Sequence, residues 1–458
     1  MEAIMGVLDI FIGFMWGWPL VIIIAVASVV YSVVLKFMQF RRFGYIAKNT
    51  LGRMFEKEHT GEGTLTPFQA ASSALAGTVG VGNIAGVGVA VAVGGPGALF
   101  WMWVVAIIAA IAKYAEVVLG VHYREKDPDT GEFRGGFMYI VKNGLKGNWG
   151  WLAFIWSFLF FIQFLISGAV QSNSIADVMS HSFGANHMIV GIIVAFFVGL
   201  VILGGIKRIG KVAEKVVPIM TVVYFLAAVI ILILNIKHLP AAFGTIFASA
   251  FKGAAPIGGF AGSTFMIALQ NGFARGVYSN EAGMGTSPFA HATAMVDHPV
   301  KQGIWGVIEV FVDTIVVCSL TGLVIVVTGA IGSGEVGASL TAKAFSIGLP
   351  GPGDLVVTIS TILFAYTTIL VAEYYSEIGL VYCFGNKLIL PFRILFLAGL
   401  IVGAVGGLQL IWGLLDAFMA VTVAINLIVV VSLYKVVVSL TNDYFGKIDA
   451  ERAKVKAE

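Results

Sequence analysis

The chain has 458 residues, of which 59% are hydrophobic and 12% are charged, and its mean hydropathy is +0.95. This composition predicts an all-α polytopic membrane protein and excludes a soluble globular domain. The formal net charge of +3 gives no reason to expect nucleic acid as a partner. Two cysteines and seven histidines show neither a disulfide framework nor zinc spacing, so we expect no cofactor and no enzyme activity.

The first 65 residues contain one membrane span followed by a basic loop. The apolar run from residue 10 to 34 predicts a transmembrane helix rather than a signal peptide, because Glu2 and Asp9 stand where a signal peptide has basic residues. When the later spans are threaded alternately, all but four of the 28 lysines and arginines fall on the side that follows this helix. The positive-inside rule then predicts a multi-pass protein of the cell membrane, with its N-terminus outside and a cytoplasmic tail at residues 441–458.

The stretch from residue 66 to 92 is predicted to be a broken transmembrane helix. It begins at Thr66 with a capping box and a proline at the first helical position. Its centre, residues 77–83 (GTVGVGN), has three glycines, and each glycine costs a helix about 1 kcal/mol relative to alanine. Backbone that unwinds in a membrane must line a cavity or a ligand, so we interpret this stretch as a transport site for an anionic group and a cation. A glycine-rich packing face between helices is the alternative.

Nine further apolar runs predict the remaining spans, which makes eleven transmembrane helices. They lie near residues 98–121, 150–179, 188–205, 214–236, 258–290, 303–330, 355–382, 390–407 and 410–437.

Ten of these spans divide into two halves, residues 66–236 and 258–440, joined by an extracellular connector at residues 237–257. Five spans in each half make the second half run inverted relative to the first, which is the 5+5 inverted repeat of many secondary transporters. The first span of the second half is also predicted to be broken, at residues 269–272 (LQNG). Paired breaks at equivalent positions point to a transporter site. A polar kink that faces another helix is the alternative.

Polar residues occur inside two further spans. Gln163, Ser167 and Gln171 repeat every four residues and therefore share one helical face, which suits a small ligand or, equally, hydrogen bonds between helices. Thr367 and Thr368 lie near the middle of the span at residues 355–382. Their hydroxyls could complete an oxygen cage around sodium, although such hydroxyls often bond to their own helix.

Charged residues inside spans are functional candidates, because burying a charge in a bilayer is expensive. Lys113 and Glu116 are three residues apart on one helical face, which predicts a plain ion pair. The other acidic residues near spans fall close to span ends, so a proton relay is not indicated. They are Asp177, Glu309, Asp313, Glu373, Glu377 and Asp416.

Residues 94–103 (GGPGALFWMW) and 274–285 (ARGVYSNEAGMG) are two highly specific runs. With the glycine-rich break and residues 374–377 (YYSE), they resemble the alanine or glycine:cation symporter family of bacteria and archaea from about residue 66 to 440. That family is related to sodium:leucine-type transporters, so the resemblance implies one N-terminal helix before a 5+5 inverted repeat. The chain departs from the family at Glu373, which follows Val-Ala where Gly-Trp is expected.

The resemblance implies a sodium site at the first break, because the relatives have Asn-Ala-Val-Gly-Leu-Gly-Asn where this chain has residues 77–83. Carried over, the sodium ligands are main-chain carbonyls and two threonine hydroxyls, from Ala76, Val79, Phe364, Thr367 and Thr368. Some relatives have a second sodium site that involves the residue which Asn83 resembles. Its threonine partner falls on Ala268 here, so we expect one coupled sodium.

The resemblance also implies a substrate site between the two breaks. The amides of Val81 and Gly82 would hold the substrate carboxylate, and aligning residues 271–274 with the relatives' Leu-Gly-Phe-Gly brings the second broken helix to the substrate. The predicted substrate-binding residues are Thr78, Gly80, Val81, Gly82, Phe164, Gly168, Gln171, Met266, Ile267, Gln270 and Phe273.

The predicted function is sodium-coupled symport of alanine or glycine into the cell by alternating access. Phe164, Met266 and Phe273 as walls leave little room for a side chain, so small neutral amino acids fit best. Sodium, the small amino acid and the lipid bilayer are then the partners. Proton coupling through Glu373 or Asp416 is the first alternative, and a channel or a substrate sensor is a weaker one.

Overall fold

The computed structural model describes residues 2–54, 56, 60–254, 262–406 and 409–457. The described part is helical except for one short antiparallel hairpin of strands β1 (Glu125–Lys126) and β2 (Phe133–Arg134). The α-helices before residue 253 are α1 (Glu2–Met15), α2 (Trp18–Val34), α3 (Met38–Arg41), α4 (Phe43–Asn49), α5 (Pro67–Thr78), α6 (Val87–Gly94), α7 (Gly97–His122), α8 (Phe137–Gly144), α9 (Gly150–Phe183), α10 (His187–Ile202), α11 (Gly205–Leu234) and α12 (Leu239–Lys252).

The α-helices after residue 262 are α13 (Phe265–Asn280), α14 (Ser287–His291), α15 (Pro299–Val310), α16 (Ser319–Val327), α17 (Ala338–Gly348), α18 (Gly353–Phe384), α19 (Ile389–Val405), α20 (Gln409–Ser432) and α21 (Tyr434–Ala457). Short 3-10 helices are η1 (Leu51–Arg53), η3 (Ile236–His238), η5 (Ala330–Ser333) and η6 (Asn386–Leu388). Two segments are π-helical, η2 (Gly82–Gly86) and η4 (Phe311–Cys318).

Within the described residues, eight helices are long and apolar enough to cross a membrane, and a ninth span is a bent pair of helices. These nine coincide with nine of the eleven spans that the sequence predicts. The other two predicted spans correspond to the shorter helices α10 and α13. The start of the predicted span at residue 258 lies outside the described residues. The count of eleven therefore stays a prediction.

The first broken helix is confirmed. A capping box starts α5, with the Gln69 amide donating to the Thr66 hydroxyl at 3.1 Å and the Thr66 amide donating to the Gln69 side chain at 3.2 Å. The helix ends at Thr78, the chain turns through residues 79–81, and the π-helical turn η2 leads into α6. The two halves meet at 47°, because the glycines remove the side-chain packing and raise the entropic cost of a straight helix here.

The predicted position of the second break is wrong. Residues 269–272 lie inside the uninterrupted helix α13, where Gly272 allows close contact with the backbone and Trp101 of α7 rather than unwinding. The break comes after Asn280, at residues 281–286, and α14 follows it. Left-handed backbone at Glu281 (φ 55°), Gly283 (φ 91°) and Gly285 (φ 75°) stops the helix.

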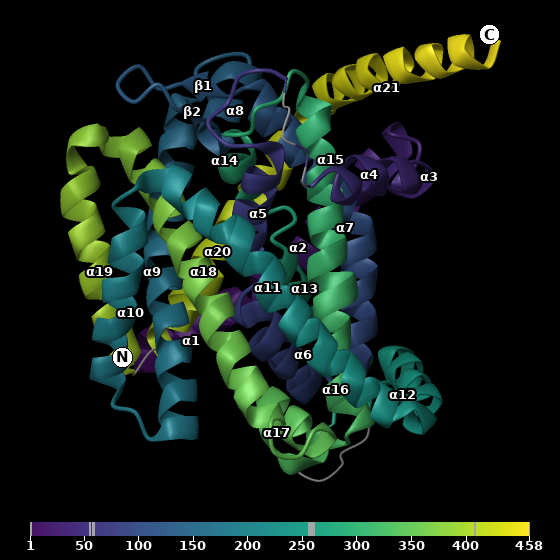
Figure 1. The fold of residues 1–458 in the computed structure, drawn as a ribbon, viewed down its shortest axis with the longest axis vertical. Coiled ribbons are helices and arrows are strands. Elements are labelled where there is room, and N and C mark those ends of the chain that lie inside the picture. Colours follow the sequence, from purple (N-terminus) through teal and green to yellow (C-terminus); the bar gives the residue numbers. More distant parts are fainter. Residues whose placement is uncertain (1, 55, 57–59, 255–261, 407–408, 458) are drawn as a thin grey trace.

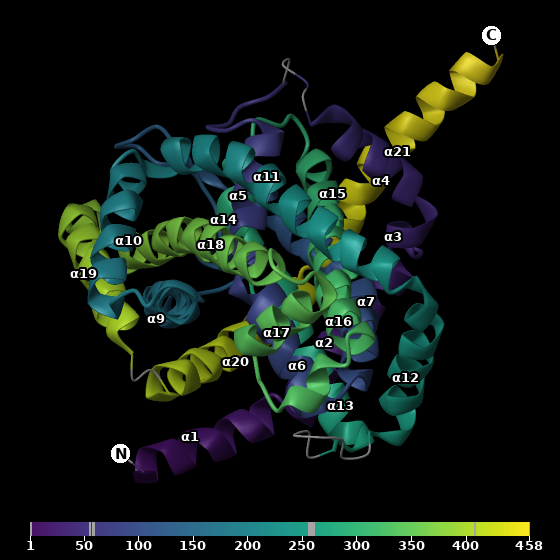
Figure 2. The same ribbon diagram turned by 60° about the horizontal axis from the view of Figure 1, so that its bottom comes forward.

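The long helices α9 and α18 pack along each other, with α10 and α19 on their outer flank (Figure 1). On the opposite flank, α7 packs against α13 and α15, and the broken helix of α5 and α6 lies between the flanks (Figures 1 and 2). The hairpin, α8 and α14 lie at one end, which we call the hairpin end, and α17 and α12 lie at the other, which we call the α17 end. Both breaks therefore lie in the interior, between the two flanks.

Candidate substrate and cation site

A buried cavity lies between the two breaks and the helices α9, α18 and α20. Its volume is about 30 Å³, room for about two water molecules. It is lined by Gly77, Thr78, Gly80, Gly82, Gln163, Phe164, Ser167, Gln171, Tyr278, Glu281, Met284, Thr368, Leu415 and Met419. Irregular backbone at membrane depth is tolerated only where protein or a polar cavity surrounds it, and both breaks meet that condition here.

Five of the predicted substrate-binding residues line this cavity. They are Thr78, Gly80, Gly82, Phe164 and Gln171. Val81 is buried in the first break but is not part of the cavity wall. Gly168 faces α19 instead, where an added Cβ would lie 2.5 Å from the ring of Phe396.

The four predicted residues of α13 do not line the cavity. They are Met266, Ile267, Gln270 and Phe273. Phe273 packs against Trp101 with ring centroids 6.4 Å apart, and Gln270 lines a different pocket. The reason is the shifted break, because the chain leaves the helix about three turns later than predicted. The second broken helix instead contributes Tyr278, Glu281 and Met284 to the wall.

Three of the five predicted sodium ligands converge at the first break. The Thr368 hydroxyl lies 3.0 Å from the carbonyl oxygen of Ala76 and 3.0 Å from that of Phe364. Gly80 makes this approach possible, because a Cβ at that position would lie 2.5 Å from the Thr368 oxygen. Oxygen atoms of this kind are the ligands that hard cations prefer.

The other two predicted sodium ligands, Thr367 and Val79, do not contact the Thr368 hydroxyl in the described hydrogen bonds. The Thr367 hydroxyl lies 3.0 Å from the Phe364 carbonyl and 3.1 Å from that of Leu363, so it bonds within its own helix. Val79 ends α5 with a non-helical ψ of 87°, which turns its carbonyl out of the helical hydrogen-bond pattern. Backbone oxygen is thus released at the break, as the glycine run predicts.

Asn83 connects the two broken helices. Its side-chain oxygen accepts a hydrogen bond from the Gly80 amide at 2.9 Å, and its nitrogen donates to Asp313 at 2.7 Å and to Ser279 at 3.0 Å. Asp313 is fully buried in η4 rather than near a span end. The hydroxyl beside Asn83 thus belongs to Ser279 rather than to position 268, and the expectation of one coupled sodium stays a prediction.

The predicted ion pair between Lys113 and Glu116 is wrong. The Lys113 ammonium lies 3.2 Å from Glu309 and donates to the carbonyl of Asn280 at 2.7 Å, while Glu116 accepts a hydrogen bond from Asn426. All of these side chains are fully buried, so each needs a partner from another helix rather than the neighbour on its own surface. Lys113 thus holds the last carbonyl of α13, where a cation is also favoured by the helix dipole.

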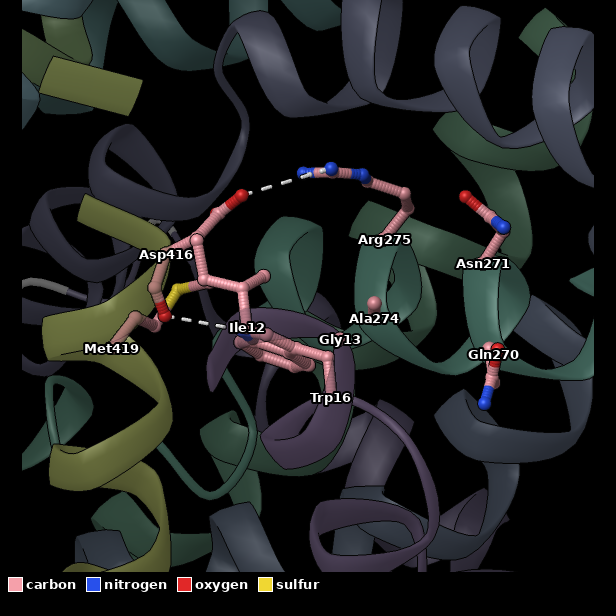
Figure 3. Close-up of a pocket in the computed structure, with 9 residues that line it drawn as sticks. All are labelled: Ile12, Gly13, Trp16, Gln270, Asn271, Ala274, Arg275, Asp416 and Met419. Atoms are coloured by element: carbon pink, nitrogen blue, oxygen red, sulfur yellow. Dashed lines mark hydrogen bonds and ion pairs between the residues drawn. The ribbon is translucent and has the colours of Figure 1, made fainter. Parts of the chain in front are cut away.

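A second pocket adjoins the cavity beside α1. Figure 3 shows Arg275 and Asp416 pointing toward each other across it, and their charged atoms lie 3.8 Å apart. The Trp16 indole donates to the Asp416 carbonyl at 3.1 Å, and Met419 lines both the pocket and the cavity. Arg275 lies inside α13. The pocket is lined by Ile12, Gly13, Trp16, Gln270, Asn271, Ala274, Arg275, Asp416 and Met419.

Aromatic rings fill the space between the cavity and the hairpin end. The ring of Phe160 lies 4.6 Å from that of Phe164 and 4.7 Å from that of Phe289, centroid to centroid. Tyr375 completes the group at 5.3 Å from Phe164 and 5.5 Å from Phe289. These side chains come from α9, α14 and α18, and Phe164 connects the group to the cavity wall.

A set of contacts that we call the Arg124 clamp closes the hairpin end itself. Arg124 donates to the carbonyls of Ala292 at 2.9 Å and Glu62 at 2.6 Å. The amides of residues 64 and 65 donate to the Thr293 carbonyl at 2.7 and 2.9 Å. The segment that leads into α5 is thereby fastened to the segment that follows α14.

Sequence reasoning missed several residues of the cavity wall, namely Tyr278, Glu281, Met284, Leu415 and Met419. The first three lie in the run at residues 274–285, which the sequence marks as highly specific. The alternation of an acid with Gly283 and Gly285 in that run was the available signal for the break.

An all-helical membrane protein whose spanning helix is broken beside a buried polar cavity has the architecture of a secondary transporter. The family model of the sodium:alanine symporter family matches residues 1–458, and the chain belongs to this family. The resemblance that the sequence motifs indicate is thereby confirmed.

Relatives of known name cover nearly the whole chain. It is 41% identical over 449 residues to "Sodium/alanine symporter AgcS" of Methanococcus maripaludis (96% of this chain, 97% of the relative). It is 40% identical over 448 residues to "Uncharacterized transporter YflA" of Bacillus subtilis (97% and 94%) and 34% identical over 449 residues to "Probable sodium/glutamine symporter GlnT" of the same organism (97% and 91%). The protein is therefore a cation-coupled amino-acid symporter rather than an enzyme, with sodium as the coupling ion of its family.

Among solved structures, a manganese transporter from Eremococcus coleocola matches 82% of this chain and 79% of its own, with 13% identity and a TM-score of 0.49.

Proposed function

We propose that this protein couples the inward flow of sodium to the uptake of a small neutral amino acid, alanine or glycine, by alternating access. The observation that carries the proposal is the position of the Thr368 hydroxyl, 3.0 Å from the carbonyl oxygens of both Ala76 and Phe364. One oxygen belongs to the helix that breaks at the cavity and the other to α18. A cation bound there, with Val79 and Thr367 as further ligands, joins the two elements.

The coupling follows from what the cation does to the unwound backbone. Carbonyl oxygens released from a helix in a membrane lack partners, so a bound sodium ion lowers the free energy of the closed arrangement. When sodium leaves on the side where its concentration is low, the link between α5 and α18 weakens. The equilibrium then shifts toward the conformation that releases the substrate.

The substrate carboxylate is assigned to the start of the second half of the broken helix. The first amides of a helix have no partner within it and carry part of the helix dipole, so they favour an anionic group. In this chain those amides belong to Val81 and Gly82, at the start of the helical stretch from Gly82 to Gly94. Thr78 and Gln171 supply side-chain polar groups in the same cavity.

The walls of the cavity favour a small substrate. Its volume of about 30 Å³ is bounded by Phe164, Met284, Leu415 and Met419, so even alanine requires some movement of these walls and a longer side chain requires more. The names of the relatives include both alanine and glutamine symporters, so the family alone does not decide the substrate.

The 5+5 inverted repeat of residues 66–236 and 258–440 is part of this proposal. Each half has a broken helix at its start, although the second break lies later than predicted. The proposed orientation places the hairpin end in the cytoplasm, because the basic loop after α2 and the basic residues of the hairpin lie there. The N-terminus, which lies away from the hairpin end, then faces outward.

Radiolabelled alanine uptake into proteoliposomes tests the proposal. An inward sodium gradient should drive accumulation, whereas equal potassium should not. Accumulation under a pH gradient without sodium would instead favour the alternative of proton coupling. That alternative has less support, because Asp416 and Glu373 each have an arginine within 4 Å, Arg275 at 3.8 Å and Arg393 at 3.5 Å.

A further inference from the structure

The cavity contains one carboxylate that the proposed sodium and carboxylate ligands do not use. Glu281 ends α13 and begins the second break with a φ of 55°. Among the described residues, only two other non-glycine residues have a positive φ. A side-chain-bearing residue adopts this conformation where its surroundings enforce it, and such positions cluster at ligand sites. The fold therefore holds the Glu281 carboxylate at the cavity wall.

Two hydrogen-bond acceptors at this wall lack a donor. The Glu281 side chain is 6% exposed, and its Oε2 atom has no hydrogen-bond partner in the described part of the chain. The Thr286 hydroxyl faces the same carboxylate without reaching hydrogen-bond geometry. Across the cavity, Gln171 is 3% exposed and its Oε1 atom is also without a donor.

A neighbouring amide shows that acceptors of this cavity do not all lack a hydrogen-bond donor. Gln163 lines the same cavity from the same helix, and its Oε1 atom accepts a hydrogen bond from the Thr422 hydroxyl at 2.8 Å. Buried acceptors normally have a partner, and one without a donor costs free energy. A bound molecule with N–H or O–H groups would supply the missing donors at Gln171 and Glu281.

The charge balance indicates what kind of molecule this is. No lysine, arginine or histidine is among the described residues that line the cavity, so Glu281 gives the wall its one formal charge. The buried ammonium of Lys113 is committed to the Asn280 carbonyl and to Glu309. Lys113 attracts the Glu281 carboxylate from a distance but forms no ion pair with it, and a buried carboxylate without a paired charge is unfavourable. The ligand that completes this wall is a cation with several N–H donors.

We propose that Glu281 and Gln171 bind the ammonium group of the amino-acid substrate. An ammonium group carries one positive charge and three N–H donors, which meets both requirements of the wall. The inference rests on the proposed function, in which the first break holds the substrate carboxylate through Val81 and Gly82. The two breaks then bind the two charged groups of one zwitterion, and Glu281 determines the specificity for amino acids over 2-hydroxy acids.

The test compares Glu281→Gln with Glu116→Gln. Both changes remove a buried carboxylate from the same region, but Glu116 does not line the cavity and its partner Asn426 can donate equally to an amide. For each purified variant, binding of alanine and of lactate is measured by the ligand-induced shift of thermal unfolding in sodium, and by inhibition of labelled alanine uptake in proteoliposomes. Lactate has the carboxylate and methyl group of alanine, with a hydroxyl in place of the ammonium.

We expect Glu281→Gln to weaken alanine binding by about 10- to 100-fold, the loss of one charge-assisted hydrogen bond, while leaving the weak binding of lactate unchanged. The half-saturating sodium concentration should change little, and Glu116→Gln should discriminate as the wild type does. Unchanged discrimination in Glu281→Gln would overturn the inference. An equal loss of alanine and lactate binding would also overturn it, because that result indicates a structural role. A loss of sodium affinity alone would overturn it as well, because Glu281 would then be a cation ligand. A wild-type protein that neither binds nor accumulates alanine would instead remove the proposed function, and this inference with it.

Discussion

The two broken helices of this protein are broken by different means and present different chemical groups. The first break is short, at residues 79–81, and it arises locally from glycines that make a continuous helix expensive. It presents main-chain carbonyls and amides to the cavity. The second break, at residues 281–286, is longer, and it presents the side chains of Glu281 and Met284, beside Tyr278 from the end of α13.

The second break has glycines of its own, at Gly283 and Gly285, but distant helices also hold it. Lys113 donates to the carbonyl of Asn280 at 2.7 Å, and Asn426 donates to the carbonyl of Gly283 at 2.9 Å. These donors replace the hydrogen bonds that a helix would have made, which is the condition for irregular backbone inside a membrane. One site thus combines a locally encoded backbone element with a side-chain element that depends on tertiary structure.

The largest effect is expected from Gly80→Val in the first break. A Cβ at this position would lie 2.5 Å from the Thr368 oxygen, so the side chain overpacks the proposed cation site. Sodium-driven alanine uptake should fall by about 100-fold or more in correctly inserted protein. Gly86→Ala is the matched control, because its Cβ would meet nothing closer than Tyr278 at 3.8 Å. Wild-type uptake in Gly80→Val would contradict the role given to the first break.

The next effect concerns the support of the second break. Lys113→Met leaves Glu309 buried with only His291, 2.6 Å away, as its neighbouring charge partner among the described residues. Breaking a buried ion pair lowers the free energy of unfolding by about 3–5 kcal/mol. Because His291 remains beside Glu309, we expect a loss near the lower limit, about 3 kcal/mol. The thermal unfolding midpoint of the purified protein measures this loss. The exposed Lys211 on α11 provides the control Lys211→Met, and equal midpoints for the two variants would show that the second break does not depend on Lys113.

Thr368→Ala should separate cation binding from substrate choice. Losing the hydroxyl between Ala76 and Phe364 should raise the half-saturating sodium concentration about tenfold, while the preference between alanine and glycine stays the same. Sodium titration of uptake at a fixed alanine concentration checks both quantities. Thr361→Ala, on the same helix, removes a buried hydroxyl that makes no hydrogen bond in the described chain and should leave the titration unchanged.

The smallest effect tests the corrected position of the second break. Gln270 lies inside α13 and does not line the cavity, so Gln270→Ala should change the KM for alanine by less than about twofold. Gln171→Ala, which removes a residue of the cavity wall, should raise that KM by about tenfold. If Gln270→Ala had the larger effect, the substrate would have to bind closer to residues 269–272.

The difference between the two breaks explains what could be predicted from the sequence. The first break, its capping box and the approach of Thr368 follow from local composition and from family resemblance, both of which are visible in one stretch of chain. The second break depends on Lys113 and Asn426, more than a hundred residues away along the chain. Gln270 and Asn271 are polar residues in an apolar run and therefore suggested a helix break, but the helix continues through them and they line the pocket beside α1.

Residue spacing also failed to predict the partners of the buried charged side chains. Lys113 and Glu116 have the spacing of an ion pair on an exposed helix. Inside the protein each side chain turns to a different neighbouring helix, to Glu309 and to Asn426. Spacing predicts surface pairs, whereas a buried pair is decided by which helices pack together.

The Arg124 clamp limits how the molecule can move. It fastens the start of the first broken helix to the chain just beyond the second, through the guanidinium group and three main-chain hydrogen bonds, of which the third runs from the Met295 amide to the Leu65 carbonyl. A motion that opened the hairpin end by swinging α5 alone would have to break all of these bonds together. A motion that carries α5 and α14 together keeps these bonds intact, so the proposed alternating access would open this end at lower cost by moving the two helices as a pair.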